Sequence, residues 1–529
     1  MPVRFPGFFS ACLAVALAAT AASARAQAQN PVTNAPSKLP AATPATTNLF
    51  TTNILTGPNL FANTNGVIRA LGLIEAIRSA VSNNFDVRIE RIEPQIAETD
   101  IQAAKGAYDP VISASGEHRD TKIDGAHTRQ ESVGLGLDGR LPTGATYSLG
   151  VDTRENASRK IFTNDFTRSG SGSATVISAR QPLLRNMWID QFRYQIQISR
   201  KQLKISELGF RLRLLSTVSL VEQAYFDWIA ARENVRVQEE AVTLARQQAR
   251  EYGVRAQIGT ARPLDQQRFE SQAASSEATL LQARRNLKAQ ENTLINLITT
   301  EFEAWHGFAI EPADQLPTID RPYDLQESWT KAFERRPDLH QLVINLEQLG
   351  LTEKLRYNQI FPQLDLTGMY GYNGSAGSLG DVYVDLADAN KPTWAVGLEA
   401  SFPIGNRTAR ANLRAIRLQK EQADERLKQS RQTIMVQVEN AINDARTGWA
   451  RIPATRAARE YAAAALRAGQ LQLQQGAVTP LELLTLQQDL TAARSDEIRA
   501  LVDYNKAVTV LLEREGTLLD ERGLTLSIH

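Results

Sequence analysis

Apolar side chains recur at a coiled-coil spacing along one long stretch of this chain. Between Leu183 and Arg255 they step by three, four and seven residues, and this average of about 3.5 residues is the period at which helices pack side by side. A second stretch, Ile404 to Gln472, is its partner, although Pro453 is predicted to kink it. Each stretch, of about seventy residues, predicts a helical rod of about 105 Å. The seam of the first consists of Leu214, Val218, Val221, Tyr225, Trp228, Val235 and Val242.

Each rod ends in the same seven-residue turn. The first copy is Gly259 to Asp265 and the second, 217 positions later, is Gly476 to Glu482. In both, the glycine suits a left-handed helix cap, the proline suits the first position of the next helix, and an acid lies in that helix's first turn. The turn therefore predicts the tip of a helical hairpin.

The helices that return from the two tips share a register and carry two apolar seams. One seam runs through Ala273, Leu280, Leu287 and Leu294, and in the second half through Leu490, Glu497, Tyr504 and Leu511. The other runs through Phe269, Ser276, Ala283 and Gln290, and in the second half through Leu486, Ala493, Ala500 and Ala507. Such narrow stripes on long helices fit a tube wall, in which each helix contacts a neighbour on either side and turns one face to water.

The repeat extends over most of the chain. Pro110 has its counterpart at Pro362, 252 positions later, whereas Pro182 has its counterpart at Pro403, 221 positions later. The first half therefore carries 31 extra residues between Pro110 and Pro182. The predicted organisation is a signal peptide (1–26), an N-terminal linker (27–66), a first repeat (67–300), an inter-repeat linker (301–322), a second repeat (323–515) and a C-terminal tail (516–529).

The apolar period changes to two within each repeat. From about 111 to 181, and again from about 363 to 402, apolar residues alternate with small or polar ones. Segments of about ten alternating residues, separated by turn residues, are the weak signature of outer-membrane strands; a soluble sheet is the alternative. The first half offers four such segments, with Leu141 to Gly144 as an inner turn. Candidate interfacial aromatic side chains are Tyr370, Tyr372, Tyr383, Trp394 and Phe402.

Two smaller patterns complete the first half. Residues 67–106 have helical periodicity that is interrupted near Asn84 and again at Pro94, which predicts two shorter helices. Gly134, Gly136 and Gly139 spell the dinucleotide-binding motif G-x-G-x-x-G. A turn and not a helix follows these glycines, so the motif lacks the context that cradles a phosphate, and it is assigned to β alternation.

The N-terminus has the layout of a secretory signal. Arg4 precedes an apolar run from Phe8 to Ala22, and small residues predict cleavage before Gln27. Cys12, the only cysteine, precedes the apolar core, so this layout disfavours lipidation, which stays the alternative for this residue. A mature chain without cysteine suits an oxidising exported compartment.

Charge and composition exclude several classes of function. With 59 basic and 58 acidic residues the net charge is +1, so no nucleic-acid partner is expected. No window of the mature chain is apolar enough for a membrane helix, so a membrane location would have to use β-strands. The five histidines show no metal-ligand spacing and no nucleophile motif appears, so neither an enzyme nor a metal or cofactor site is expected.

The duplicated order of helices, strands, long helix, tip and return helix resembles the TolC family of outer-membrane efflux channels, as does Gln181 to Arg185 before the long helix. The resemblance runs from about Leu71 to Leu512. It implies an α+β membrane protein that forms a homotrimer, with long coiled-coil helical hairpins building a periplasmic α-barrel. Four strands from each subunit would share a twelve-stranded β-barrel in outer-membrane lipid. The inter-repeat linker would form part of a belt around the tunnel.

The same resemblance gives the tips a role. In that family the tips meet a periplasmic adaptor protein, which implies docking through Gly259, Pro263, Leu264, Gly476, Pro480 and Leu481. Asp265 and Glu482 match the acids that narrow the periplasmic mouth, although electrostatics at a helix N-terminus explain them equally well. Two departures, Val478 in place of a latch arginine and Thr485 in place of a second acid, imply a different latch, for which Arg262 is a candidate.

The predicted function is the outer-membrane exit duct of a tripartite efflux system, a passive conduit for small molecules supplied by an inner-membrane pump. A conduit for type I protein secretion is the alternative within the same class. A soluble periplasmic coiled-coil scaffold or adaptor is the alternative from another class, since long hairpins alone would permit it.

Overall fold

The computed structural model describes residues 68–524 except 124–125, 161–165, 306–308 and 476. The chain divides into two units, Met1–Leu60 and Phe61–His529, and all described residues belong to the second. The predicted signal peptide, Cys12 and the N-terminal linker therefore lie outside the described residues, as does Gly476.

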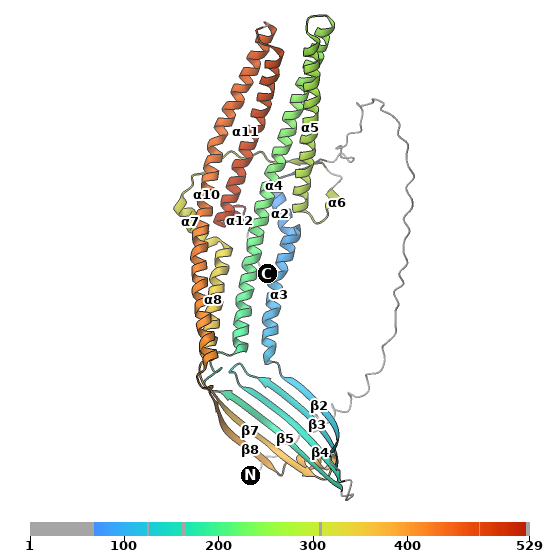
Figure 1. Ribbon diagram of the computed structural model, residues 1–529, viewed down its shortest axis with the longest axis vertical. Coiled ribbons are helices and arrows are strands. Elements are labelled where there is room, and N and C mark those ends of the chain that lie inside the picture. Colours follow the sequence, from blue (N-terminus) through green and yellow to red (C-terminus); the bar gives the residue numbers. More distant parts are fainter. Residues whose placement is uncertain (1–67, 124–125, 161–165, 306–308, 476, 525–529) are drawn as a thin grey trace, which may run out of the picture. The chain divides into compact units, whose positions relative to one another are not determined.

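Two long helical hairpins dominate the second unit (Figure 1). Helix α4 (Gln191–Gln257) packs along α5 (Pro263–Ile298), and α10 (Arg407–Gln474) packs along α11 (Pro480–Glu515). Helix α11 also packs along α4, which joins the hairpins. The predicted seam of the first rod is confirmed, since all seven of its residues are buried. Helix α10 continues through Pro453.

The first long helix begins later than its apolar pattern predicted. Residues 183–190 cross the end of the sheet without forming a helix, and α4 starts only at Gln191. Asn186 adopts a left-handed conformation with φ 68°, and its amide N–H donates to the Asn358 side-chain oxygen over 2.7 Å. Asp190 then caps the helix by accepting from the amides of Phe192 and Arg193. These local polar contacts outweigh the continuing apolar period.

Shorter helices line the lower half of the long ones. Helices α2 (Leu73–Asn83) and α3 (Phe85–Lys105) pack against α4, while α7 (Leu325–Arg335) and α8 (Pro337–Asn358) pack against α10. The predicted break at Asn84 is confirmed, and its side chain accepts from the Asp86 amide over 2.9 Å. The predicted break at Pro94 is wrong. Pro94 is buried inside α3, because packing along α4 offsets the one backbone hydrogen bond that proline removes.

A short parallel sheet ties the inter-repeat linker to the first repeat. Strand β1 (Ile68–Leu71) pairs with β6 (Ala309–Pro312). Along the chain, β6 follows the small helix α6 (Phe302–Trp305) and precedes α7. Asp314 accepts from the Leu73 amide over 2.7 Å and from the Tyr225 hydroxyl over 3.2 Å. Burial, followed by the charge of Asp314, raises the pKa of Tyr225. The linker is therefore held by polar contacts with the core.

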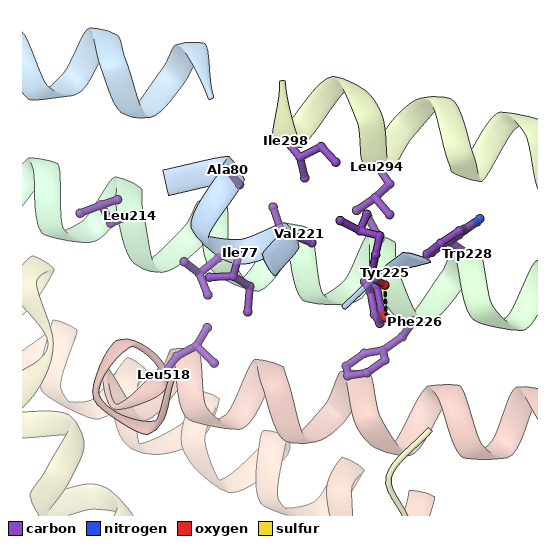
Figure 2. Close-up of a cluster of buried hydrophobic side chains, with 14 of the residues drawn as sticks. Ile77, Ala80, Leu214, Val221, Tyr225, Phe226, Trp228, Leu294, Ile298 and Leu518 are labelled. Atoms are coloured by element: carbon purple, nitrogen blue, oxygen red, sulfur yellow. Dashed lines mark hydrogen bonds between the residues drawn. The ribbon is translucent and has the colours of Figure 1, made fainter. Parts of the chain in front are cut away.

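The largest apolar core lies at this level of the long helices, and we call it the belt core (Figure 2). It joins α2, α4, α5, α11 and the short helix α12 (Leu518–Glu521) around Tyr225 and Trp228, whose ring centroids are 5.6 Å apart. The Tyr225 hydroxyl reaches the Leu71 carbonyl over 2.9 Å. Its fully buried large members include Leu71, Ile77, Leu214, Tyr225, Trp228, Leu294, Ile298 and Leu518.

One antiparallel sheet of six strands contains all the alternating segments. Its order is β2-β3-β4-β5-β7-β8, and a single 3-10 turn (Gly106–Tyr108) separates α3 from β2. The strands are β2 (Val111–Ile123), β3 (Ala126–Arg140), β4 (Thr146–Lys160), β5 (Phe166–Pro182), β7 (Gln363–Ala376) and β8 (Pro392–Ser401). The glycines of the G-x-G-x-x-G motif lie within β3, as their assignment to β alternation predicted.

The strand count corrects the expectation of four strands from each subunit. The first half contributes four strands and the second half two, because the 31 extra residues form an additional pair. The predicted inner turn joins β3 to β4, with the Gly144 amide donating to the Leu141 carbonyl over 2.9 Å. The residue pattern was therefore right where the family plan was wrong.

Over the half nearer the long helices, the sheet has one apolar and one polar face, and beyond Val133 the first face carries charged residues such as Asp120, Arg129 and Glu131. Cross-strand partners point the same way, so the printed register assigns each side chain to a face. Exposed members of the apolar face are Ile112, Val133, Leu135, Leu366, Trp394, Val396 and Leu398. Opposite them lie Ser113, Ser115, Ser132, Asp152, Ser173 and Asn373. An exposed apolar face of this extent marks contact with lipid or with another protein.

Helix α9 (Leu379–Ala387) covers part of the apolar face at the end of the sheet away from the long helices. Its buried Val382 and Leu386 fill a hollow beside glycines of β5 and β7. A Cβ atom at Gly172 would lie 2.6 Å from Val382 Cγ1, so no larger residue fits there without moving the helix. The buried Glu155 carboxylate accepts from the Leu379 amide over 2.9 Å and fixes the start of α9.

Candidate functional site at the hairpin tips

The first tip ends its helix with a complete Schellman cap. Gly259 has φ +79°, its N–H donates to the Ala256 carbonyl over 3.1 Å, and the Thr260 N–H donates to the Arg255 carbonyl over 2.8 Å. This pair of bonds defines the motif, in which glycine avoids the clash that a Cβ suffers in the left-handed conformation. The left-handed cap predicted at Gly259 is confirmed.

Replacing Gly259 with alanine is expected to destabilise the first tip by about 1–2 kcal/mol. An added Cβ would meet no neighbouring atom, so the cost comes from backbone conformation alone. The Thr260 amide should then exchange with solvent about 5- to 30-fold faster in hydrogen-exchange measurements. Gly253→Ala is the matched control, because Gly253 lies within α4 and also has open space around it. Equal exchange in both variants would contradict the prediction.

The second tip starts its return helix with a capping box. The Glu482 amide donates to the Thr479 hydroxyl over 3.3 Å, and the Glu482 carboxylate accepts from the Thr479 amide over 2.8 Å. On the incoming side, the Ala477 amide donates to the Gln472 carbonyl over 2.9 Å. Pro480 occupies the first turn of α11, as Pro263 does in α5.

The two acids at equivalent positions have different local partners. The Asp265 carboxylate lies 3.9 Å from the Arg268 guanidinium, and its helix has no side-chain cap because Arg262 stands where the second tip has Thr479. The Asp265 side chain is 17% exposed, whereas Glu482 is exposed. The structure thus uses the Glu482 carboxylate for capping, and this side chain remains exposed.

Each tip presents an exposed leucine beside its proline. Leu264 is 55% exposed and Leu481 is 54% exposed, and both occupy the second position of their return helices. Two equally exposed leucines at equivalent positions make a paired apolar feature at the ends of the hairpins. Adaptor docking through these two leucines stays a prediction.

A small apolar cluster near the tips joins the two hairpins. Tyr252 of α4 stacks on Phe269 of α5 with ring centroids 4.1 Å apart, and Leu484 of α11 packs against both. Phe269 lies on a predicted apolar seam, but no pattern in the sequence indicated that these three side chains meet. The periodicity of Tyr252 within α4 was the only available signal.

Between this cluster and the belt core, the hairpins contact each other mainly through polar side chains. Gln488 Nε2 donates to Gln272 Oε1 over 3.0 Å, and the Arg494 guanidinium lies 2.7 Å from the Glu240 carboxylate. Exposed pairs of this kind contribute about 0–1 kcal/mol each. The upper halves of the hairpins are therefore held together much less strongly than the belt core.

No cluster of potential metal ligands accompanies the described part of the tips. Within the described ranges, no three His, Cys, Asp or Glu side chains gather as metal ligands would. His118 lies beside Glu131 and His127 beside Asp120, both in the sheet. His340 Nε2 lies 2.8 Å from the Glu334 carbonyl oxygen. These contacts are structural.

Comparison with known proteins agrees with this arrangement. Residues 329–514 match the family described as outer membrane efflux protein. The outer membrane efflux protein BepC of Brucella suis is 22% identical over 489 residues, covering 90% of this chain and 91% of BepC. The CmeC outer membrane channel of Campylobacter jejuni superposes with a TM-score of 0.64 at 16% identity, over 84% of this chain and 86% of CmeC. The outer membrane protein VceC of Vibrio cholerae gives 0.62 at 15% identity, over 84% of this chain and 96% of VceC.

The chain is related to the TolC-type outer membrane efflux channels. The protein therefore lies in the outer membrane and extends into the periplasm. The family that residues 329–514 match is one of efflux channels and not of enzymes. None of the helices in the described part of the protein combines the length and apolarity that crossing a membrane requires.

Proposed function

We propose that the protein is the exit duct of a tripartite efflux system and passes small molecules from an inner-membrane pump, through a periplasmic adaptor, to the outside. The observation that carries this proposal is a two-faced sheet, apolar on one side and polar on the other, in the same chain as two helical hairpins with α4 and α10 about 100 Å long. Such a chain can line one continuous aqueous path across both a membrane and the periplasm.

A single copy cannot form that path. The described sheet has six strands and two edges, whereas about eight strands are the minimum for a closed membrane sheet. The long hairpins likewise bury narrow seams and leave polar faces in water. We propose a homotrimer, because three copies would close the sheet and surround a water-filled tunnel with their hairpins.

The proposal is tested by complementation and by electrical recording. The protein should restore drug resistance to cells that lack their own exit duct, and the purified protein should insert into planar bilayers as discrete conducting units. Restored export of a type I secreted protein, without restored drug resistance, would favour the secretion alternative. Release from membranes by a high-salt wash, with no conductance, would favour a scaffold and overturn the proposal.

We further propose that Glu482 lines the periplasmic mouth and favours cations. Glu482→Gln removes the charge but retains a residue that suits the capping box, whereas Thr479→Ala removes the cap and keeps the charge. The first variant is expected to lower the cation-to-anion permeability ratio by about two- to five-fold, as the loss of a nearby charge in water would. Thr479→Ala should leave the ratio unchanged.

Bilayer recordings in a salt gradient, with and without divalent ions, measure that ratio. If Glu482→Gln behaves as the unmodified protein, then Glu482 serves the helix start only. If Thr479→Ala changes selectivity as much as Glu482→Gln does, tip geometry and not charge is responsible. Asp265→Asn provides the equivalent test in the first half.

A further inference from the structure

We propose that three copies close their sheets into one ring of eighteen strands, through a joint between β2 of one copy and β8 of the next. This inference rests on the threefold assembly proposed above and adds the joint, its register and the width of the exit. Six strands from each of three copies give eighteen, in place of the twelve that the family resemblance implied.

The two edges of the sheet are long and uncovered. Strand β2 has 13 residues and β8 has 10, and in the described part of the chain each packs substantially against one neighbour only, β3 and β7 respectively. Proteins normally shorten, bend or cover such edges, because a free row of N–H and C=O groups recruits another strand. Neither β2 nor β8 has an interior proline, so both can pair along their length.

Strand direction and face both permit this joint. Neighbouring strands alternate in direction, so with six strands the two edges run in opposite directions and β2 meets β8 of the next copy as an antiparallel pair. An odd number of strands would have brought two parallel edges together. The apolar face also continues across the joint, because Ile112 and Ala114 of β2 then lie beside Ala400 and Leu398 of β8.

The tilt of the strands sets the register. One row of paired residues starts at Val111, where β2 leaves the helices, and passes through Asp138, Ser148, Ser178 and Met369 to Ala395. Strand β8 continues six residues beyond Ala395, to Ser401 at the helical end of the sheet. Closed sheets require such a stagger. Placing Val111 level with Ser401 of the next copy puts Ala114 opposite Leu398, within two residues.

Eighteen strands make a wide exit. With strands about 4.8 Å apart and tilted by about 40°, the ring has a diameter of about 36 Å between backbones, against about 24 Å for twelve strands. The cross-section is therefore about twice as large. The polar face, with its many serines, lines this opening.

Engineered disulfides test the joint. Ala114→Cys in β2 is combined with cysteine at Val396, Leu398 or Ala400 of β8, and the sole natural cysteine, Cys12, lies in the predicted signal peptide. Oxidation should link three copies into a trimer on non-reducing gels for at least one combination. Ala114→Cys with Leu135→Cys is the matched control, since these residues pair within one copy and should give no intermolecular bond.

Removing one hairpin tests the width. Deletion of 111–145 joins Pro110 to Thr146, both at the helical end of the sheet, and leaves β4, β5, β7 and β8 with the contacts of α9 intact. Neutral polymers added from the sheet side of a bilayer report the size of this opening. The largest polymer that enters should be smaller by at least about a third in radius for the deletion variant than for the full chain, because side chains narrow both rings by the same amount.

The outcomes separate the two proposals. The eighteen-strand ring is overturned if the trimer conducts but none of the three cysteine pairs crosslinks. It is also overturned if the full chain admits only polymers that a twelve-stranded ring would admit. Either result leaves the proposed exit duct unaffected. Absence of both conductance and trimers overturns the exit duct itself. If the deletion variant does not fold, the crosslinks and the polymer limit of the full chain still decide.

Discussion

Replacing Arg522 with alanine is expected to lower the free energy of unfolding by about 3 kcal/mol, the low end of the range for breaking a buried ion pair. Glu222, which is 0% exposed, accepts from Arg522 Nε over 2.5 Å and from Arg522 Nη2 over 2.9 Å. Burial lowers the pKa of Arg522, but the contacts with Glu222 outweigh it and the pKa is raised. The Arg522 side chain is 26% exposed, which is why the low end of the range applies.

The loss arises because alanine leaves the Glu222 carboxylate in the protein interior with only the Thr509 hydroxyl, at 2.8 Å, as a partner. Urea unfolding of the purified protein, followed by tryptophan fluorescence, measures it. The double variant Glu222→Met with Arg522→Met removes both charges and should recover most of the stability. A double variant as unstable as Arg522→Ala would show that packing, and not an unpaired charge, causes the loss.

Replacing Leu264 and Leu481 together with aspartate is expected to abolish drug export and to weaken adaptor binding by more than about 100-fold. Burying one leucine side chain contributes about 1.5–3 kcal/mol, so two lost leucines correspond to at least about 3 kcal/mol, and every 1.4 kcal/mol is tenfold in affinity. Both side chains are more than half exposed, so the substitutions should leave the folded hairpins intact.

Binding of the purified protein to the adaptor that co-purifies from crosslinked cells measures this effect, and drug susceptibility measures its consequence. Leu264→Met with Leu481→Met is the matched control, because methionine keeps an apolar side chain of similar volume. Each single aspartate variant shows whether the two halves contribute equally. Unchanged affinity in the double aspartate variant would remove the tips from the docking surface.

The helices could be predicted where a repeating apolar period determines them. The seam residues of α4, such as Trp228 at 1% exposure, follow one period over several turns, so local exceptions average out. Predictions of where a helix begins or breaks were wrong where tertiary packing or local polar contacts determined the backbone instead. Pro94 sits inside α3 because tertiary packing overrides its helix-breaking tendency, and residues 183–190 leave the helical path because Asn186 and Asp190 bind nearby groups.

The number of strands was predicted correctly by the local residue pattern and wrongly by the family plan. Alternation between Pro110 and Pro182 indicated four strands, and the structure contains four, whereas the family plan suggested two. A resemblance to a family predicts the features that its members share. It does not predict an insertion that is present in one chain. The alternating residues are local to this sequence, so they recorded the insertion.

At the tips, the repeated turn predicted the hairpins but not their differences. Thr479 and Glu482 have the T-x-x-E spacing of a capping box, a signal that sequence analysis left unused, and Arg262 at the equivalent place in the first tip breaks it. The stack of Tyr252 on Phe269 joins two helices whose relative rotation no sequence pattern fixes.

The belt core lies far from the hairpin tips, so a small rotation at the core moves the tips a long way. Tyr225, in that core, and Gly259, in the turn that follows the same helix, are 34 residues apart, which is about 51 Å at the rise of an α-helix. A rotation of about 10° at the core would carry the tip about 9 Å. A displacement of this size at the tip is comparable with the width of a small solute.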